Sequence, residues 1–224
     1  MCRLFGQISL EQASAADDLA RKPYALLKIS AHAERPQKDG WGIGWFDRRG
    51  PRVVKSGRPA FQEKKPFARA ARKAVSRVVI GHIRAASNPK ELDIKLLLGK
   101  VNAQPFAGDG MLFAHNGTVE IPDEVTSRLG PYARRARGRN DSEVYFLQFL
   151  KFYRRTGDVA RALNACVSET HALWRRAKRR HPKKKRPISG LNTLISDGKS
   201  LHALCLYTHA SRAKSLGSGL QPWG

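Results

Sequence analysis

The chain begins MCRLFGQIS (residues 1–9), so that one of its three cysteines directly follows the initiator methionine. The residues after this cysteine have the alternating apolar content of a strand. Methionine aminopeptidases act when the second residue is small, and we therefore expect the mature chain to start at Cys2. Its α-amine and thiol have ordinary pKa values of about 8 and about 8.5. The amine can then serve as general base for its own thiol, although a cysteine at this position also occurs by chance.

Length and composition favour one domain over 1–224, because 41% apolar residues suffice for a real core. No apolar run reaches the ~20 residues of a membrane helix, and charges interrupt the first thirty residues, so we expect neither a membrane span nor secretion. Three cysteines without C-x-x-C spacing indicate reduced thiols and a cytoplasmic protein. The seven histidines show no ligand spacing, and no metal site is expected.

The net charge is +24, from 42 basic and 18 acidic residues. Nine basic residues fall in 175–186 and five in 128–139. The simpler interpretation of such runs is a solvated helix end and a loop. An excess of basic residues also favours contact with nucleic acid or another polyanion. Net charge bears on association with partners more than on the fold.

The pattern along the chain predicts strands, two central helices and strands again, which indicates helices packed on sheets in a layered α/β or α+β domain. The glycines of WGIGW (41–45) do not indicate a nucleotide site, because a strand and a turn follow them and no helix begins there. The predicted strands are 3–9, 41–47, 52–56, 78–84 and 111–116, the helices are 63–76, 140–155 and 158–180, and 191–196 and 200–207 form a hairpin.

Polar residues lie at the ends of two of these strands. Strand alternation places Arg84 on the face of Ile80 and His82, at the end of GHIRAAS (81–87), where a guanidinium can hold a carboxylate or simply lie on the surface. In AHNG (114–117), Asn116 and Gly117 are either a hairpin turn or an oxyanion hole formed by an amide and a backbone N–H.

The helix predicted over 140–155 begins with more polar groups than one cap requires. Asn140, Asp141 or Ser142 can serve as N-cap. A spare carboxylate at a helix start stays ionised in the helix dipole and can pair with an ammonium group. A carboxylate, a guanidinium, a thiolate and an oxyanion hole together describe acyl transfer on a γ-glutamyl compound, of which glutamine is the simplest.

In this arrangement the sequence resembles the class II glutamine amidotransferases, which are N-terminal-nucleophile hydrolases. The resemblance implies a four-layer αββα sandwich without metal or organic cofactor. It implies Cys2 as nucleophile and base, Asn116 and Gly117 as oxyanion hole, and Arg84, Ser87 and Asp141 as the clamp for the substrate's carboxylate and ammonium. It rests on MCRLFG (1–6), KDGWGIGW (38–45), GHIRAAS (81–87), NAQPF (102–106), AHNGTVE (114–120), NDSE (140–143) and LNTLISDG (191–198), in family order.

The chain departs from this family in three ways. Gln104 stands where the motif usually has histidine, which we expect to affect support of the site. The chain ends soon after its hairpin, with SLGSGLQPWG (215–224), which leaves the completeness of the C-terminal sheet open. The charge of +24 is not a family trait.

The function expected from these features is cysteine-dependent hydrolysis of a γ-glutamyl amide. Either glutamine gives ammonia to a separate synthase subunit, or a γ-glutamyl conjugate is cleaved. The alternative is a basic module on an inactive hydrolase scaffold, which would bind nucleic acid or another polyanion through 128–139 and 175–186.

Overall fold

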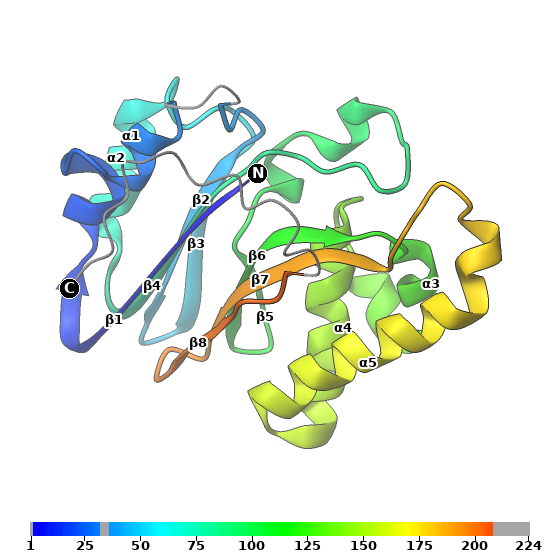
Figure 1. The fold of residues 1–224 in the computed structure, drawn as a ribbon. Coiled ribbons are helices and arrows are strands. Elements are labelled where there is room, and N and C mark those ends of the chain that lie inside the picture. Colours follow the sequence, from blue (N-terminus) through cyan, green and yellow to red (C-terminus); the bar gives the residue numbers. More distant parts are fainter. Residues whose placement is uncertain (1, 32–35, 208–224) are drawn as a thin grey trace.

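The computed structural model describes residues 2–31 and 36–207, which form two antiparallel sheets between two helical layers (Figure 1). The first sheet has the strand order β1-β4-β2-β3 and the second β5-β6-β7-β8. The layers therefore follow one another as helix, sheet, sheet and helix. The expected αββα sandwich is confirmed, and each described sheet has four strands.

The first sheet begins with the strand that follows Cys2. The outer face of this sheet is covered by helices, and their shared core contains Leu19, Trp41, Phe67 and Ile83. The elements of this half are β1 (Arg3–Ser14), η1 (Asp17–Arg21), α1 (Leu26–Ile29), β2 (Trp41–Asp47), β3 (Gly50–Ser56), α2 (Lys64–Lys73) and β4 (Val75–Ile83).

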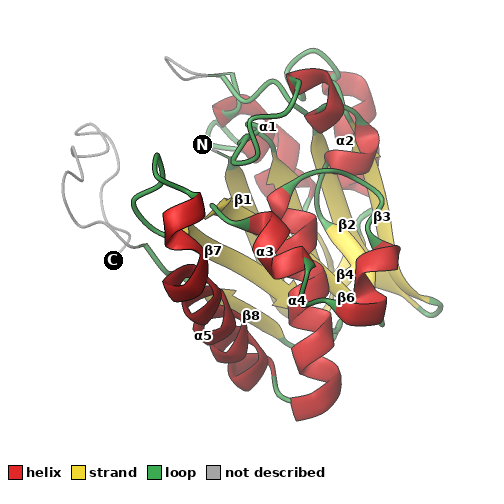
Figure 2. Cartoon of the chain, turned by 90° about the vertical axis from the view of Figure 1, so that its right-hand side faces the viewer, coloured by secondary structure: helices red, strands yellow, loops and turns green. Residues whose placement is uncertain are grey.

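Helices α4 and α5 cover the second sheet, as Figure 2 shows in a view from that side. Their core is the largest in the molecule and contains Phe113, Tyr145, Phe149 and Ile195. The elements here are η2 (Ile94–Leu97), η3 (Lys100–Asn102), β5 (Phe106–Gly108), β6 (Met111–Val119), α3 (Pro122–Thr126), η4 (Gly130–Arg135), α4 (Asp141–Thr156), α5 (Val159–Ala177), η5 (Lys178–Arg180), β7 (Ile188–Ser196) and β8 (Leu201–Leu204).

The layer between the two sheets is thin, and its buried apolar residues are Ile80, Leu112 and Ala114. Two glycines of WGIGW allow strand β2 to lie close to Gln104 and Pro105. A Cβ on Gly42 would lie 2.2 Å from the carbonyl oxygen of Gln104, and one on Gly44 would lie 3.0 Å from the ring of Pro105. These glycines therefore serve sheet packing.

The predicted strands and helices are confirmed, with shifted ends. The helix expected over 63–76 ends at Lys73, because β4 already begins at Val75. The predicted hairpin is formed by β7 and β8, which pair from Thr193–Leu204 to Ser196–Leu201. The tail 215–224 lies outside the described residues. Among the described residues, no helix has both the length and the apolar character that crossing a bilayer requires.

Candidate active site

Cys2 lies immediately before β1, beside the segment that follows β4. The pairing of Arg3 with Ile83 sets this position, since the two strands are antiparallel. The Cys2 side chain is buried, and its Sγ atom is 3.3 Å from both the backbone nitrogen and the carbonyl oxygen of Ala85. The Ala85 N–H donates to the sulfur, and the thiol can donate to the carbonyl. The main chain of Ala85 therefore fixes the orientation of the thiol.

The thiol opens into a cavity of about 270 Å³ between the two sheets' ends. Of the six predicted site residues, the cavity brings together four: Cys2, Ser87, Asn116 and Gly117. The remaining lining residues are Ala85, Ala86, Thr118, Ser189, Asn192 and Tyr207. A γ-carboxamide of amino-acid size fits a cavity of this volume.

Asn116 and Gly117 lie inside β6, opposite Asn192 and Leu191 of β7. The alternative of a hairpin turn at these two residues is therefore wrong. Gly117 does not adopt a positive φ. Glycine is required here because a Cβ would lie 1.9 Å from the carbonyl oxygen of Gly190.

Next to Asn116 and Gly117, the His115 ring is held at both of its nitrogens. Its Nε2 is 3.1 Å from the carbonyl oxygen of Gly190, and its Nδ1 is 3.0 Å from Oγ of Ser142. Because a carbonyl only accepts, Nε2 carries the proton and Nδ1 accepts from the hydroxyl. Burial lowers the pKa of His115 to about 4, so the ring is neutral and structural.

Gln104 supports the same strand from the other side. Its amide nitrogen donates to the carbonyl oxygen of His115 at 3.2 Å, and its amide oxygen accepts from the His115 N–H at 2.7 Å. The glutamine thus binds the backbone next to Asn116 with a matched pair of hydrogen bonds.

Asp141 is the first residue of α4, while Asn140 caps the helix by accepting from the Glu143 N–H at 2.8 Å. The carboxylate of Asp141 is therefore free of capping. It accepts from Ser87 Oγ at 3.1 Å and from the Val119 N–H at 2.8 Å. Burial raises its pKa to about 6, an effect of tertiary packing that the helix dipole alone does not describe.

Arg84 does not line the cavity, although it lies next to it. The guanidinium is 3% exposed, and its Nη1 donates to the carbonyl oxygen of Leu97 at 2.6 Å. Burial lowers the pKa of Arg84 as well. Its positive charge acts on Cys2 and on Asp141, so the three groups form one electrostatic unit.

The pKa of the Cys2 thiol is raised, mainly by burial, and the Ala85 N–H and the Arg84 charge oppose this shift. A neutral resting thiol needs a base before it can attack. Among residues 2–31 and 36–207, no three His, Cys, Asp or Glu side chains are placed to hold a metal ion.

Sequence inspection missed several residues of the site. Asn192, Ser189 and Tyr207 line the cavity, and the Asn192 Oδ1 atom is buried without a hydrogen-bond partner among the described residues. Asp39 was also missed, and its carboxylate accepts from the Ala86 N–H at 2.7 Å. Asn192 lies in the motif LNTLISDG and Asp39 in the motif KDGWGIGW, and these motifs could have identified both residues as part of the site.

The αββα layers, with a cysteine at the start of the first strand facing the end of a strand in the second sheet, define the fold class of the N-terminal-nucleophile hydrolases. The family model described as "Glutamine amidotransferases class-II" matches residues 1–213. The chain therefore belongs to the class-II glutamine amidotransferase family.

Two named relatives are similar to this chain. YafJ of Escherichia coli (strain K12), named as a glutamine amidotransferase, is 28% identical over 218 residues, which cover 92% of this chain and 73% of that protein. The gamma-glutamyl-hercynylcysteine sulfoxide hydrolase of Mycobacterium tuberculosis (strain CDC 1551 / Oshkosh) is 29% identical over 139 residues, 59% of this chain and 54% of that protein. The chain thus spans about half the length of that relative.

A solved glutamine aminotransferase class-II domain protein from Silicibacter pomeroyi has a TM-score of 0.57 and 23% identity, with 77% of this chain and 71% of that chain covered. This likeness concerns the fold.

Proposed function

We propose that the protein hydrolyses a γ-glutamyl amide bond with Cys2 as its nucleophile, after removal of Met1. The observation that carries this proposal is that Cys2, Asn116 and Gly117 line one cavity. Acyl transfer requires a nucleophile and oxyanion donors on the same carbonyl group.

In the first half-reaction, the α-amine of Cys2 takes the thiol proton, and the sulfur attacks the γ-carbonyl carbon. Asn116 and Gly117 stabilise the oxyanion of the tetrahedral intermediate. The α-ammonium then gives its proton to the leaving nitrogen, and ammonia or an amine departs. The raised thiol pKa is the reason that this base is needed.

In the second half-reaction, water attacks the γ-glutamyl thioester while the α-amine accepts a proton from it. The resulting tetrahedral intermediate collapses with cleavage of the C–S bond, the sulfur recovers its proton from the α-ammonium and the glutamyl acid leaves. Amine and thiol return to their starting forms, so the cycle needs no cofactor.

The substrate's α-amino acid head binds on the Ser87 side of the cavity. Asp141 holds the ammonium, because its carboxylate is not used as a cap and is linked to the cavity by Ser87. Arg84 holds the carboxylate. Its Nη1 now donates to the Leu97 carbonyl, and the substrate carboxylate replaces this acceptor.

Two substrate classes fit this chemistry. With glutamine, the ammonia would pass to a separate synthase, as expected of an amidotransferase domain. With a γ-glutamyl conjugate, the same residues would simply cleave the bond. The names of the relatives support both, since one is a glutamine amidotransferase and another hydrolyses a γ-glutamyl compound. Three free cysteines support the cytoplasm as the compartment.

The test is intact-mass and peptide analysis after exposure to a diazo-ketone analogue of glutamine. We expect one adduct, on an N-terminal peptide that lacks Met1. Cys2→Ala should form no adduct and show no glutaminase activity, whereas Cys205→Ser, which removes an exposed free thiol, should behave as wild type. An active protein that retains Met1, or an adduct on Cys205, would refute the proposal.

The alternative, a polyanion-binding module on an inactive scaffold, has weaker support. Three residues of 175–186 have structural partners, since Arg180 and His181 pair with Glu124, and Lys184 donates to the carbonyl oxygens of Pro89 and Glu120. A module of this kind would bind nucleic acid with a steep salt dependence and would be indifferent to Cys2→Ala.

A further inference from the structure

A second cavity, of about 710 Å³, lies on the far side of the segment that supports the active-site strand. It is lined by residues of β3, η3, β5, α4 and the end of η4. None of its lining residues belongs to the active-site cavity. Its volume is in the range of small-molecule sites, which is about 300–1,000 Å³.

The walls of this cavity are strongly cationic. Its charged residues are Lys55, Lys100, Arg134, Arg135, Arg137 and Glu143. The only carboxylate is already satisfied, since Glu143 accepts from the backbone N–H groups of Arg137 at 3.1 Å and Gly138 at 2.6 Å. Asp109, outside the cavity, holds Arg135 through two hydrogen bonds of 2.7 and 2.9 Å.

The other four cations have no carboxylate partner within ion-pair distance among the described residues. They reach the cavity from three separate segments, so the fold gathers like charges that would otherwise repel one another. Such a concentration of unpaired positive charge in a concave site stabilises a bound anion.

Lys55 is the innermost of these cations. Its Nζ donates to the carbonyl oxygen of Ala103 at 2.7 Å and lies 5.3 Å from the centre of the Phe106 ring. The pKa of Lys55 is lowered to about 8, mainly by burial; Glu143 opposes this shift, and the charges of Arg137 and Lys100 contribute to it. A bound anion would reverse this shift.

From this geometry we infer that the cavity binds the phosphate or diphosphate group of a small organic molecule. Arg134 and Arg137 supply planar guanidinium donors that suit phosphate oxygens, and Lys55 and Lys100 supply point charges. Phe106, Phe146 and Leu147 give an apolar wall for the organic part. Because the cations surround one hollow, a compact anion fits better than an extended nucleic-acid strand.

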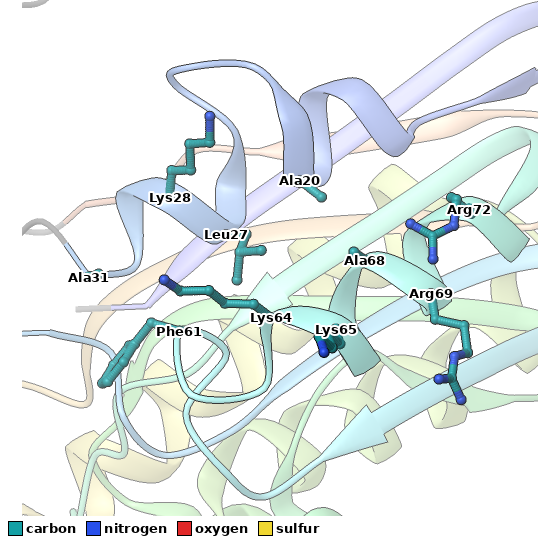
Figure 3. A pocket seen from close by; sticks show the side chains of 10 residues that line it. All are labelled: Ala20, Leu27, Lys28, Ala31, Phe61, Lys64, Lys65, Ala68, Arg69 and Arg72. Atoms are coloured by element: carbon teal, nitrogen blue, oxygen red, sulfur yellow. The ribbon is translucent and has the colours of Figure 1, made fainter.

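Another basic groove, of about 720 Å³, provides a comparison. It lies between α1 and α2, and Figure 3 shows Lys28 and Lys64 at one end and Arg69 and Arg72 at the other. These cations are spread along an apolar floor that includes Leu27. The groove is therefore a matched control, because it has a similar volume and the same number of lining cations as the proposed phosphate cavity.

Calorimetric titration of the full chain with pyrophosphate at low salt tests the inference. We expect saturable binding at one site, weakened at least tenfold in Arg134→Ala/Arg137→Ala and changed less than twofold in Arg69→Ala/Arg72→Ala. At pH 8, titration in buffers of different ionisation enthalpy should show proton uptake on binding. The uptake should disappear in Lys55→Met, because Lys55 is the group that titrates there.

Three other outcomes of these experiments would overturn the inference. Absence of pyrophosphate binding at millimolar concentration would show that the cavity is not a phosphate site. Equal weakening in the two double variants would show a general charge effect. Tight binding of a twenty-nucleotide single strand that pyrophosphate does not displace would assign these cations to nucleic acid instead. The pyrophosphate and single-strand experiments measure binding alone, so their outcomes do not depend on glutaminase activity.

Discussion

Gly117 of β6 lies so close to the backbone of Gly190 in β7 that a Cβ on Gly117 would lie 1.9 Å from the Gly190 carbonyl oxygen. The same carbonyl accepts from the ring of His115. One backbone contact thus fixes both the oxyanion-hole glycine and the histidine before it. The position of the proposed oxyanion hole follows from sheet packing.

Gly117→Ala should therefore be costly. The new methyl group meets backbone that cannot rotate away, and we expect a loss of about 2–3 kcal/mol in unfolding free energy and at least a tenfold loss in kcat. Urea denaturation and a glutaminase assay measure the two effects. Gly190→Ala is the control, since its Cβ would lie 3.3 Å from the Tyr207 side chain and should cost much less. Equal costs would contradict this account.

Asp141 should give the enzyme an acid limb. Its pKa is raised to about 6, so the carboxyl becomes protonated as the pH falls through that value, and the substrate ammonium loses its counter-charge. We expect kcat/KM for glutamine to fall below pH 6, mainly through KM. In Asp141→Asn the limb should vanish and KM should be high at every pH, whereas Asp123→Asn, at an exposed carboxylate, should keep the wild-type profile. A limb that survives in Asp141→Asn would rule out this role.

Arg84→Ala should raise KM by at least tenfold and change kcat much less, because the guanidinium is proposed to hold the α-carboxylate that binding and transition state share. Steady-state kinetics with glutamine separate the two constants. Arg77→Ala, on an exposed position of the same strand, controls for loss of charge on β4. An unchanged KM would remove Arg84 from the substrate clamp.

Gln104→Ala should lower kcat without abolishing substrate binding. It removes both hydrogen bonds to the His115 backbone and leaves buried polar groups unpaired, a cost of about 1–3 kcal/mol. Gln104→His, the residue that the family motif usually carries, should restore much of the loss because its ring can also donate and accept. Thermal unfolding and kcat are the measurements. If Gln104→Ala keeps the wild-type kcat, the support from Gln104 is not needed for catalysis.

The order of strands and helices was predictable from the sequence because their apolar periodicities are regular and their breaks are marked. The alternation in β4 was predicted correctly, with Ile80 between the sheets and Val79 and Ile83 in the outer core. The sequence did not distinguish a hairpin turn from an oxyanion hole at Asn116 and Gly117, because a tight turn and a close approach to Gly190 both require glycine.

The other differences between the sequence-based predictions and the structure arise from tertiary packing. The Asp141 pKa depends on desolvation by tertiary packing, which no local helix rule describes. The Arg84 guanidinium donates to the carbonyl oxygen of Leu97, which lies thirteen residues further along the chain, and this contact could not be predicted from the local sequence. Asn192 enters the cavity only because β7 pairs with β6.

The thin layer of Ile80, Leu112 and Ala114 has a consequence for catalysis. In the proposed mechanism, one sheet carries the sulfur and the other carries the oxyanion donors, so this layer sets the spacing between the two halves of the reaction centre. A single added methyl group at Ala114 would push the sheets apart and lower turnover without itself touching the substrate.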